Sequence, residues 1–500
     1  MRDTIIGFVP PPLKTPWSIR IAAAPLLLLT IALGVWGIQR SLWTDEAWVA
    51  NSILSPSISG MFYYPEWLQS TPPLFLALMR AAVHAFGASN AAFRIVPLIF
   101  AVAGVGCMIL LTRRLVSAPV AVLACALLAF HPTVIEYAHT AKQYSAELAA
   151  SAGILLATAC YLDNPSRRRF IWLVGAFVLA LPLAWSTVFL LPGVVLAVLG
   201  NGSRRRAASL ALIFGAVLAI LYFAFIRENL SPQLRTFWIA TAQKPSAGLM
   251  AALMFCVAAL LWAGYRRSWI EIAALLPCLL LAAADLLRVY PGEPRTRLFA
   301  LPCFLLAAAM IAEDIRAWVP GRISGNRSVA RLASAALLLI AAGVGSESIL
   351  RQLRDNPEQP KEDLQGAVGK LRRLVSPRDL LLVHASVLEG FRLYANIEGW
   401  RDHHALFGNT GWPCCARGRI TGPNSSKIAA VNADVDRLVP SGFTGRVWLF
   451  YSARHTHWVY IGNDEGILWR SHLWDRGCPP GPYFNLWNLV ICAVDCAHAR

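Results

Sequence analysis

The chain has 500 residues, of which 57% are hydrophobic and only 15% are charged. Soluble domains carry closer to a quarter of charged residues, so this composition argues against a wholly soluble protein. The net charge of +17 would suit a nucleic-acid-binding protein, but the basic residues form short runs between long apolar segments. That distribution is typical of a membrane protein and argues against nucleic acid as a partner.

The first apolar segment, at about residues 19–38, is long enough to cross a bilayer and lacks a small-residue cleavage site. We interpret it as a retained transmembrane helix rather than a signal peptide. Arg2, Lys14 and Arg20 flank its N-terminal side. Because positive residues stay in the cytoplasm, the N-terminus is predicted to be cytoplasmic.

Further apolar segments recur as far as Leu350 and predict a polytopic α-helical membrane protein with about 11 transmembrane helices. The expected spans lie at about 19–38, 93–112, 119–138, 145–162, 170–187, 188–201, 207–226, 248–265, 269–287, 297–312 and 331–349. With a cytoplasmic N-terminus, this count predicts that all the arginine-rich loops are cytoplasmic, namely those with Arg113–Arg114, Arg167–Arg169, Arg204–Arg206, Arg266–Arg267 and Arg316–Arg331. The longer loops, with most of the acidic and aromatic residues, then lie outside.

The segment 71–86 is apolar but contains Arg80 and His84. Counting it as a span would reverse every later loop and place the arginine clusters outside. We therefore predict an amphipathic helix at the outer membrane surface, with a buried re-entrant helix as the alternative.

The last part of the chain, residues 351–500, has the composition of a globular domain and opens with a charged linker that contains Pro357 and Pro360. Leu380–His384 and Arg446–Ser452 are predicted buried strands, and a helix is expected from the first strand through Tyr394. A small α/β domain follows from this pattern. An oxidising exterior would favour disulfides among its five cysteines, and the pattern leaves Cys478 paired with either Cys492 or Cys496.

Two adjacent carboxylates, Asp45 and Glu46, come just after the first span, on the predicted outer side. Carboxylates at a membrane surface are costly unless they are exposed, paired or functional. In a purely structural interpretation, Thr44 caps a helix and both acids lie near its positive end. In a functional interpretation, one of them is a general base for an acceptor hydroxyl.

Two later outer loops carry further polar residues. Between the third and fourth spans lie Glu136, Lys142 and Tyr144, which line either a cavity or a solvated loop with internal ion pairs such as Glu136 with Lys142. Before a late span lie Arg295 and Arg297, although arginine is disfavoured on the outer side. Arginine can grip a phosphate with two parallel hydrogen bonds, so this loop predicts either a phosphate site or contact with lipid headgroups. Arg94, at the mouth of the second span, is interpreted as an interfacial residue and is left out of the site.

The sequence contains no phosphate-binding loop, no dinucleotide fingerprint after a strand and no nucleophile elbow. The energy for any reaction is therefore expected from an activated substrate rather than from ATP. The paired histidines His403–His404 and His455 with His457 have no cysteine or carboxylate partner at a recognisable spacing, which argues against a metal site there.

These features, in this order, resemble the polyprenyl-phosphate-dependent glycosyltransferases of the GT-C superfamily, in particular bacterial relatives of the protein O-mannosyltransferases and of the lipid A aminoarabinose transferase. The resemblance rests on W-T-D-E-A at 43–47, T-P-P-L-F at 71–75, R-R at 113–114, E-Y-A-H-T-A-K-Q-Y-S-A-E at 136–147 and E-P-R-T-R-L-F-A-L-P at 293–302. Thr71 stands where the aminoarabinose branch has a lysine, which argues against that branch.

The resemblance implies a GT-C-like transmembrane domain over residues 1–350 and an extracytoplasmic soluble domain over residues 351–500. It implies a donor sugar carried on a polyprenyl phosphate, a hydrophobic groove for the lipid tail, and transfer to an envelope glycan, lipid or protein. Asp45 with Glu46 would be catalytic, or Asp45 would bind a divalent metal ion. The predicted substrate-binding residues are Glu136, Lys142, Tyr144, Arg295 and Arg297.

The resemblance also implies a location in the inner membrane, with the C-terminal domain in the periplasm. A transporter or flippase of lipid-linked glycans is the alternative, but such a protein concentrates its ionisable residues near the middle of the membrane. Here they cluster at the outer ends of the spans. Neither the sugar, the acceptor nor the need for a metal follows from the sequence.

Overall fold

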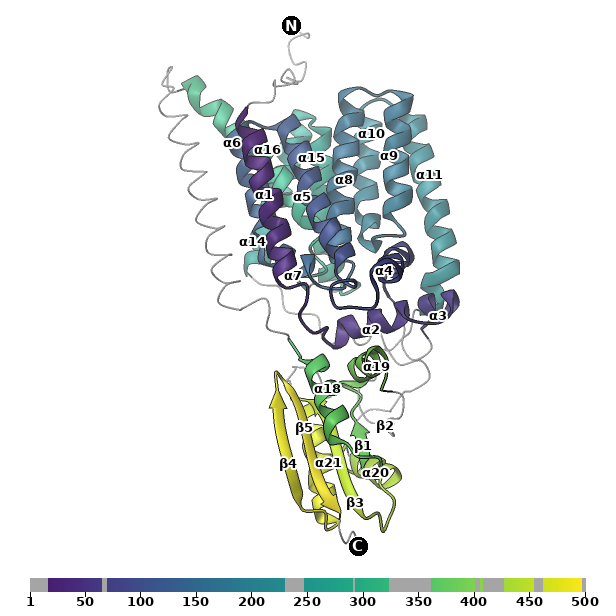
Figure 1. Ribbon diagram of the computed structural model, residues 1–500. Coiled ribbons are helices and arrows are strands. Elements are labelled where there is room, and N and C mark those ends of the chain that lie inside the picture. Colours follow the sequence, from purple (N-terminus) through teal and green to yellow (C-terminus); the bar gives the residue numbers. More distant parts are fainter. Residues whose placement is uncertain are drawn as a thin grey trace.

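A computed structural model of the chain describes residues 17–64, 70–229, 247–290, 293–322, 361–400, 405–407, 427–453 and 462–496. It comprises a bundle of long apolar helices and a five-stranded sheet below one end of that bundle (Figure 1). Three short elements run between the two parts: α2 (Thr44–Ile53), α3 (Ile58–Phe62) and α4 (Pro73–Phe86).

The long helices of the bundle coincide with the first ten expected spans, and the eleventh, 331–349, lies outside the described residues. They are α1 (Trp17–Trp36), α5 (Ile95–Leu115), α6 (Ala118–Ala129) with α7 (Pro132–Ala138), α8 (Tyr144–Asp163), α9 (Arg167–Ala180), η1 (Trp185–Phe189) with α10 (Leu190–Gly200), α11 (Arg204–Leu221) with η2 (Tyr222–Ile226) and α12 (Arg227–Asn229), α14 (Ala247–Arg266), α15 (Trp269–Leu286) and α16 (Ala300–Arg322).

Within the described residues, four helices are long and apolar enough to cross a membrane, and a fifth arises if α6 and α7, bent by 57°, form one broken span. The count of about 11 spans stays a prediction. The outward faces of the bundle are strongly apolar: Leu212 of α11 is 74% exposed and Leu261 of α14 is 72% exposed. Side chains of this kind are stable on an outer surface when lipid, rather than water, surrounds them.

The arginine-rich turns gather at the end of the bundle that is farthest from the sheet (Figure 1). Arg114, at the end of α5, pairs with Asp163, at the end of α8, at 3.0 Å. Arg206 of α11 donates to the carbonyl of Pro165, in the turn between α8 and α9, at 2.7 Å. These contacts join successive turns at one end, as the positive-inside pattern predicts for a single membrane face.

Helix α4 occupies the segment that was predicted to lie outside the set of spans. Phe75, Leu76 and Met79 on one face of α4 are fully buried, whereas Leu78 and Phe86 are 37% and 66% exposed. The buried side chains pack with residues of α2, of the start of α5 and of the C-terminal region in one continuous cluster. Arg80, on the other face, donates to the carbonyl of Ser55 at 2.9 Å. Helix α4 therefore has the one buried and one exposed face of an amphipathic helix, and its place at the outer membrane surface stays a prediction.

The C-terminal region contains α18 (Leu364–Leu374), β1 (Leu380–Val383), α19 (Leu388–Ile397), β2 (Ala405–Phe407), α20 (Lys427–Leu438), β3 (Gly445–Ser452), α21 (Gly462–Asp475), β4 (Pro480–Leu486) and β5 (Leu489–Cys496). The strand order is β2-β1-β3-β5-β4. Strand β1 runs parallel to β2 and β3, whereas β5 is antiparallel to both β3 and β4. The two predicted strands correspond to β1 and β3.

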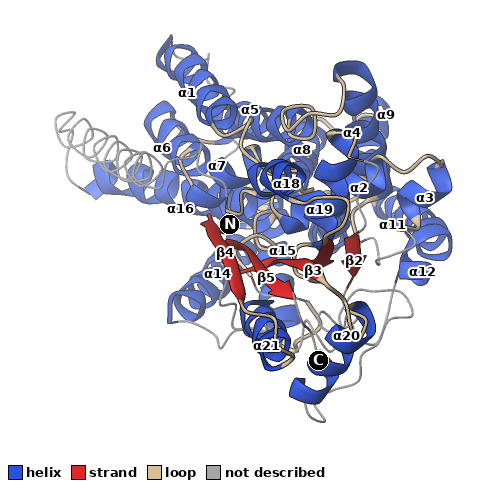
Figure 2. Ribbon diagram, turned by 60° about the horizontal axis from the view of Figure 1, so that its bottom comes forward, coloured by secondary structure: helices blue, strands red, loops and turns tan. Residues whose placement is uncertain are grey.

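The sheet separates two apolar layers because side chains alternate along each strand. On β3, Trp448 and Phe450 pack with α18 and α19 on the side of the helix bundle, whereas Leu449 packs with α20 and α21 on the other side. Figure 2 shows these helix pairs on opposite faces of the sheet. Cys478 is disulfide-bonded to Cys496, one of the two expected pairings. Because the bundle-side layer continues into α2 and α4, the sheet is tightly joined to the helices.

Candidate active site

The polar residues predicted for the site gather around the beginning of α2, where the helix bundle meets the C-terminal region (Figure 1). Helix α2 begins at Thr44, so Asp45 and Glu46 lie in its first turn. This position agrees with the structural interpretation, in which both acids lie near the positive end of a helix. The hydroxyl of Thr44 does not cap this helix, however. It donates instead to Glu362 of the C-terminal region at 2.7 Å. The two adjacent acids then turn toward different partners.

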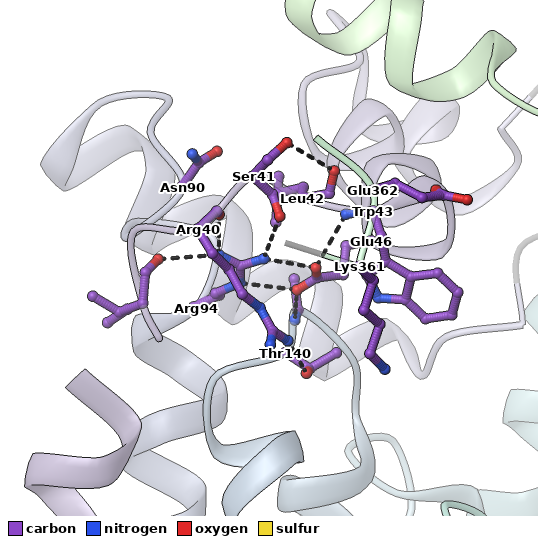
Figure 3. A network of polar contacts seen from close by, with 12 residues as sticks. Arg40, Ser41, Leu42, Trp43, Glu46, Asn90, Arg94, Thr140, Lys361 and Glu362 are labelled. Carbon is purple, nitrogen blue, oxygen red and sulfur yellow. Dashed lines mark hydrogen bonds and ion pairs between the residues drawn. The ribbon is translucent and has the colours of Figure 1, made fainter. Parts of the chain in front are cut away.

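Glu46 is completely buried and forms an ion pair with Arg94 at 2.7 Å, and both side chains have 0% exposure (Figure 3). Its two carboxylate oxygens accept hydrogen bonds from Nε and Nη2 of Arg94, from the backbone of Trp43 and from the backbone of Ala141. Burial alone favours the protonated acid, but the charge and hydrogen bonds of Arg94 outweigh it and lower the pKa of Glu46 to about 2.

Arg94 also donates to the backbone carbonyls of Ile38 and Ser41, at 3.2 Å each, and to that of Arg40. It therefore joins the end of the first span, α2 and the start of α5. A carboxylate that is held by four donors and shut off from solvent has no free lone pair for a substrate proton. The structure argues against Glu46 as a base, and the catalytic hypothesis is left to Asp45.

Asp45 is 25% exposed and forms an ion pair with Arg295 at 3.2 Å, across 250 positions of sequence. Arg295 pairs at the same time with Glu293 at 2.5 Å. The acid that follows the first helix and the arginine of the late loop therefore meet at one end of the bundle. A partly exposed carboxylate beside a guanidinium is accessible to substrate in a way that Glu46 is not.

Lys142 lies beside this pair, with its ammonium group 5.6 Å from the centre of the Trp48 ring on α2. Burial lowers the pKa of Lys142, and the negative charge of Asp45 partly opposes that effect. Tyr144, at the start of α8, is buried and packs edge-to-face on Tyr137 at 4.8 Å between ring centres. Two cations and two tyrosines thus surround the one accessible carboxylate of α2.

The two remaining predicted residues lie at the edge of this cluster in ion pairs of their own. Glu136 pairs with Lys361 of the C-terminal region. The ion pair suggested for a solvated loop joined Glu136 to Lys142 instead. Arg297 pairs at 2.8 Å with Asp285, at the end of α15. The structure brings Asp45, Lys142, Tyr144 and Arg295 together, and places Glu136 and Arg297 around them.

Four residues that were not predicted for the site also build this region: Arg94, Trp48, Lys361 and Glu362. Arg94 carried a usable signal, because a charged residue at the mouth of an apolar span requires a partner, and Glu46 was the available acid. Lys361 and Glu362 carried none. They are ordinary surface residue types in a charged linker, and only the fold brings them next to α2.

Among the residues that the structure describes, no three histidine, cysteine or acidic side chains gather in an arrangement that could hold a metal ion. Two carboxylates of the site, Asp45 and Glu293, share Arg295 between them. This arrangement does not fit a divalent metal site, and we derive no step through a metal ion.

The sequence matches one family, described as dolichyl-phosphate-mannose-protein mannosyltransferase, over residues 70–226. That range includes the Pro-Pro-Leu segment and the loop with Lys142 and Tyr144. No curated protein matches the sequence.

Solved structures give a likeness over almost the whole chain. ArnT from Cupriavidus metallidurans in the apo state has a TM-score of 0.56 and 13% identity, with 95% of this chain and 97% of that chain covered. The same protein bound to undecaprenyl phosphate has a TM-score of 0.55 and 12% identity over the same shares. The oligosaccharyltransferase of Archaeoglobus fulgidus has a TM-score of 0.51 and 14% identity, with 85% and 67% covered.

At such low identity these likenesses establish the fold. The chain has a GT-C-type membrane fold, and the resemblance to GT-C glycosyltransferases that the order of motifs indicated is confirmed.

Proposed function

We propose that the protein is a membrane glycosyltransferase that moves one sugar from a polyprenyl-phosphate carrier to an acceptor outside the cytoplasm. The observation that carries this proposal is the Asp45–Arg295 pair, which joins a carboxylate and a phosphate-binding type of side chain at one end of the bundle. The matched family and the solved structures of the same fold support it, since each is a glycosyltransferase by name or superfamily.

The orientation follows from the separation of charges along the bundle. The arginine turns that include Arg114 and Arg206 lie at the end away from the sheet, and the positive-inside rule assigns that end to the cytoplasm. The site and the C-terminal region then face the periplasm, and the protein resides in the inner membrane. The Cys478–Cys496 disulfide supports this orientation, because disulfides persist in oxidising compartments.

The donor is inferred from the charges at the site and from the likeness to ArnT, which has been solved with undecaprenyl phosphate. The phosphate of the carrier would bind Arg295 and Lys142, and the polyprenyl chain would lie along the apolar helices. Binding of the phosphate to Arg295 would compete with Asp45 for the guanidinium. Asp45 would thereby be freed to face the acceptor hydroxyl when the donor is in place.

The reaction then needs one base and one stabilised leaving group. Asp45 accepts the proton of the acceptor hydroxyl while that oxygen attacks the anomeric carbon of the donor sugar. The bond from the anomeric carbon to the phosphate oxygen breaks, and the carrier leaves as polyprenyl phosphate. Arg295 and Lys142 stabilise the charge that develops on that oxygen, an effect worth roughly 3 kcal/mol for a well-placed donor.

The other predicted residues have supporting roles in this proposal. Tyr144 forms a wall beside Arg295, where its ring would contact the sugar or the phosphate. Glu136 and Arg297 border the entrance through their pairs with Lys361 and Asp285. The acceptor is an envelope glycan, lipid or protein.

A transporter of lipid-linked glycans is the second candidate, and the fate of the sugar–phosphate bond separates it from the enzyme. The purified chain is reconstituted in vesicles with synthetic undecaprenyl-phosphate-linked pentoses and hexoses and with envelope extracts as acceptors. Mass spectrometry then follows free undecaprenyl phosphate and glycosylated products. The enzyme proposal predicts both with at least one donor. Movement of intact donor across the bilayer without release of undecaprenyl phosphate would establish the transporter instead.

A further inference from the structure

Three consecutive residues at the beginning of α2 are held in three directions. Glu46 is tied to the helix bundle through Arg94 and the backbone of Ala141. Thr44 is tied to the C-terminal region. Asp45, between them, contacts Arg295 in the site. Because a helix turns by a fixed angle per residue, fixing the residues on both sides of Asp45 also fixes the direction of its Cα–Cβ bond, and with it the side of the helix on which its carboxylate lies.

Glu362 makes two of the contacts between Thr44 and the C-terminal region; the carbonyl of Ser386, 3.1 Å from the Thr44 hydroxyl, makes a third. It comes just before α18 and is only 4% exposed. One carboxylate oxygen accepts from both the backbone N–H of Thr44, at 3.0 Å, and its hydroxyl, at 2.7 Å. The other oxygen accepts from the hydroxyl of Ser452 on β3, at 3.4 Å. The carboxylate thus joins the central strand of the sheet to the first residue of α2.

The contact with Thr44 has a clear physical function. The first N–H groups of a helix have no partner within the helix, and an anion placed there also interacts favourably with the helix dipole. Glu362, 318 positions away in sequence, supplies both the acceptor and the charge for α2. Glu362 adds to a local contact, in which the carboxylate of Glu46 accepts from the backbone N–H of the N-cap residue Trp43 at 3.3 Å.

Further bonds hold the segment just before α2 to the same C-terminal region. The hydroxyl of Tyr394 on α19 accepts from the backbone of Leu42 at 2.7 Å and donates to Asn90 at 2.9 Å. The backbone N–H of Gln365 donates to the hydroxyl of Ser41 at 3.0 Å. The C-terminal region therefore holds this loop at three successive positions, and Glu362 is the last of these contacts before Asp45.

We propose that Glu362 is a positioning residue for Asp45, which makes the C-terminal region part of the frame of the active site rather than only a cover over it. This inference rests on the proposed glycosyltransferase function. Glu362 acts through Thr44 and need not touch the substrate. Its loss would let the first turn of α2 shift and would misdirect the carboxylate of Asp45.

The test uses the full-length chain with the donor that supports transfer by the wild type. In Glu362→Ala, we expect kcat to fall by between about 10- and 100-fold, the range that a misplacement near 1 Å produces, while the KM for the donor stays within two-fold. Glu362→Gln keeps an acceptor oxygen and should recover most of the rate. Glu398→Ala, on the same region but away from α2, is the matched control and should leave kcat unchanged.

A second variant, Thr44→Val, tests whether Glu362 acts through Thr44. It also keeps the proposal testable if Glu362→Ala does not fold. Thr44→Val removes the hydroxyl donor but keeps the backbone N–H, so it should lower kcat less than Glu362→Ala does. If Glu362 acts through Thr44, the loss of kcat in the double variant should be smaller than the product of the two single losses. Multiplied losses in the double variant, or a lower melting temperature with wild-type kcat in the folded fraction, would overturn the proposal.

The measurements distinguish a failure of this inference from a failure of the proposed function. If the wild type releases no undecaprenyl phosphate from any donor, the function itself is wrong. If the wild type transfers sugar and Glu362→Ala does so equally fast, only the role of Glu362 is wrong.

Discussion

The two ends of the helix bundle both carry ion pairs, but they use them differently. At the end with the arginine turns, Arg114 and Asp163 pair at 3.0 Å with 38% and 39% of their side chains exposed. At the end with the site, Arg94 and Glu46 pair at 2.7 Å with no exposure at all. The first pair joins the ends of two helices, α5 and α8, whereas the second joins three segments that are distant in sequence.

The difference in solvent exposure decides what each ion pair contributes to the protein. Exposed pairs are screened by water and add little stability, so the arginine turns chiefly set the orientation in the membrane. A buried pair gives up its hydration, and it is maintained only when its geometry and its further hydrogen bonds are good. The Glu46–Arg94 pair therefore fixes the shape of the loop that presents Asp45.

The largest effect that we expect comes from breaking the buried pair. Arg94→Met should leave Glu46 buried without a counter-charge and should cost about 3–5 kcal/mol of stability. We expect a large drop in melting temperature in detergent and no transfer activity. Arg114→Met, the same change at the exposed pair, should cost at most about 1 kcal/mol. Equal melting temperatures for the two variants would contradict the contrast between the ends.

The buried Glu46–Arg94 pair marks a limit of what the sequence alone can predict. Hydropathy and arginine-rich turns predict spans because the membrane imposes length and charge rules on each segment separately. A charged residue such as Arg94 at the mouth of a span indicates that it needs an acidic partner, but the Glu46–Arg94 contact itself depends on how two segments pack against each other. For this reason Glu46 was grouped with Asp45 as catalytic, although one is buried and saturated and the other is accessible.

The next largest effect concerns Arg295, which meets Asp45 in the site. Arg295→Ala should lower kcat by roughly 100-fold or more, since it removes a preorganised donor at the leaving phosphate. Arg295→Lys should restore only part of the rate, because an ammonium group cannot bind two oxygens in parallel. Steady-state release of undecaprenyl phosphate measures both. A variant Arg297→Ala with a larger loss than Arg295→Ala would reverse the roles that we assign to the two arginines.

A smaller effect should appear in the pH dependence and should involve Lys142. The ammonium form is the one that can hold a phosphate, and burial lowers the pKa of Lys142. The lysine therefore loses its proton at a lower pH than an exposed lysine does, and the rate should fall on the alkaline side before the ordinary lysine range is reached.

Two variants of Lys142 check this assignment. Lys142→Arg should move the alkaline limb to higher pH, because a guanidinium keeps its proton. Lys142→Met should abolish that limb and leave a rate roughly ten-fold lower. An alkaline limb unchanged in Lys142→Met would show that another group causes it.

The C-terminal region shows the same division between what the sequence predicts and what it does not. The strands β1 and β3 were predicted because each is a short apolar run, and both are buried. The exposed edge strand β4 has no such run and was not predicted. Nor did the sequence indicate that Lys361 and Glu362 contact the loop around Asp45. These contacts span more than 200 positions, and they follow from the way the sheet packs on α2.

The central claim is that Asp45 is the catalytic carboxylate at the outer end of the bundle. The most direct measurement compares transfer by Asp45→Asn with transfer by Asp163→Asn. The two changes are chemically identical, and each removes the acid of an aspartate–arginine pair, one at each end. We predict that Asp45→Asn lowers kcat by about 100-fold or more, with normal expression and melting temperature. Asp163→Asn should retain the wild-type rate. Equal rates for the two variants, or a loss confined to Asp163→Asn, would contradict the account.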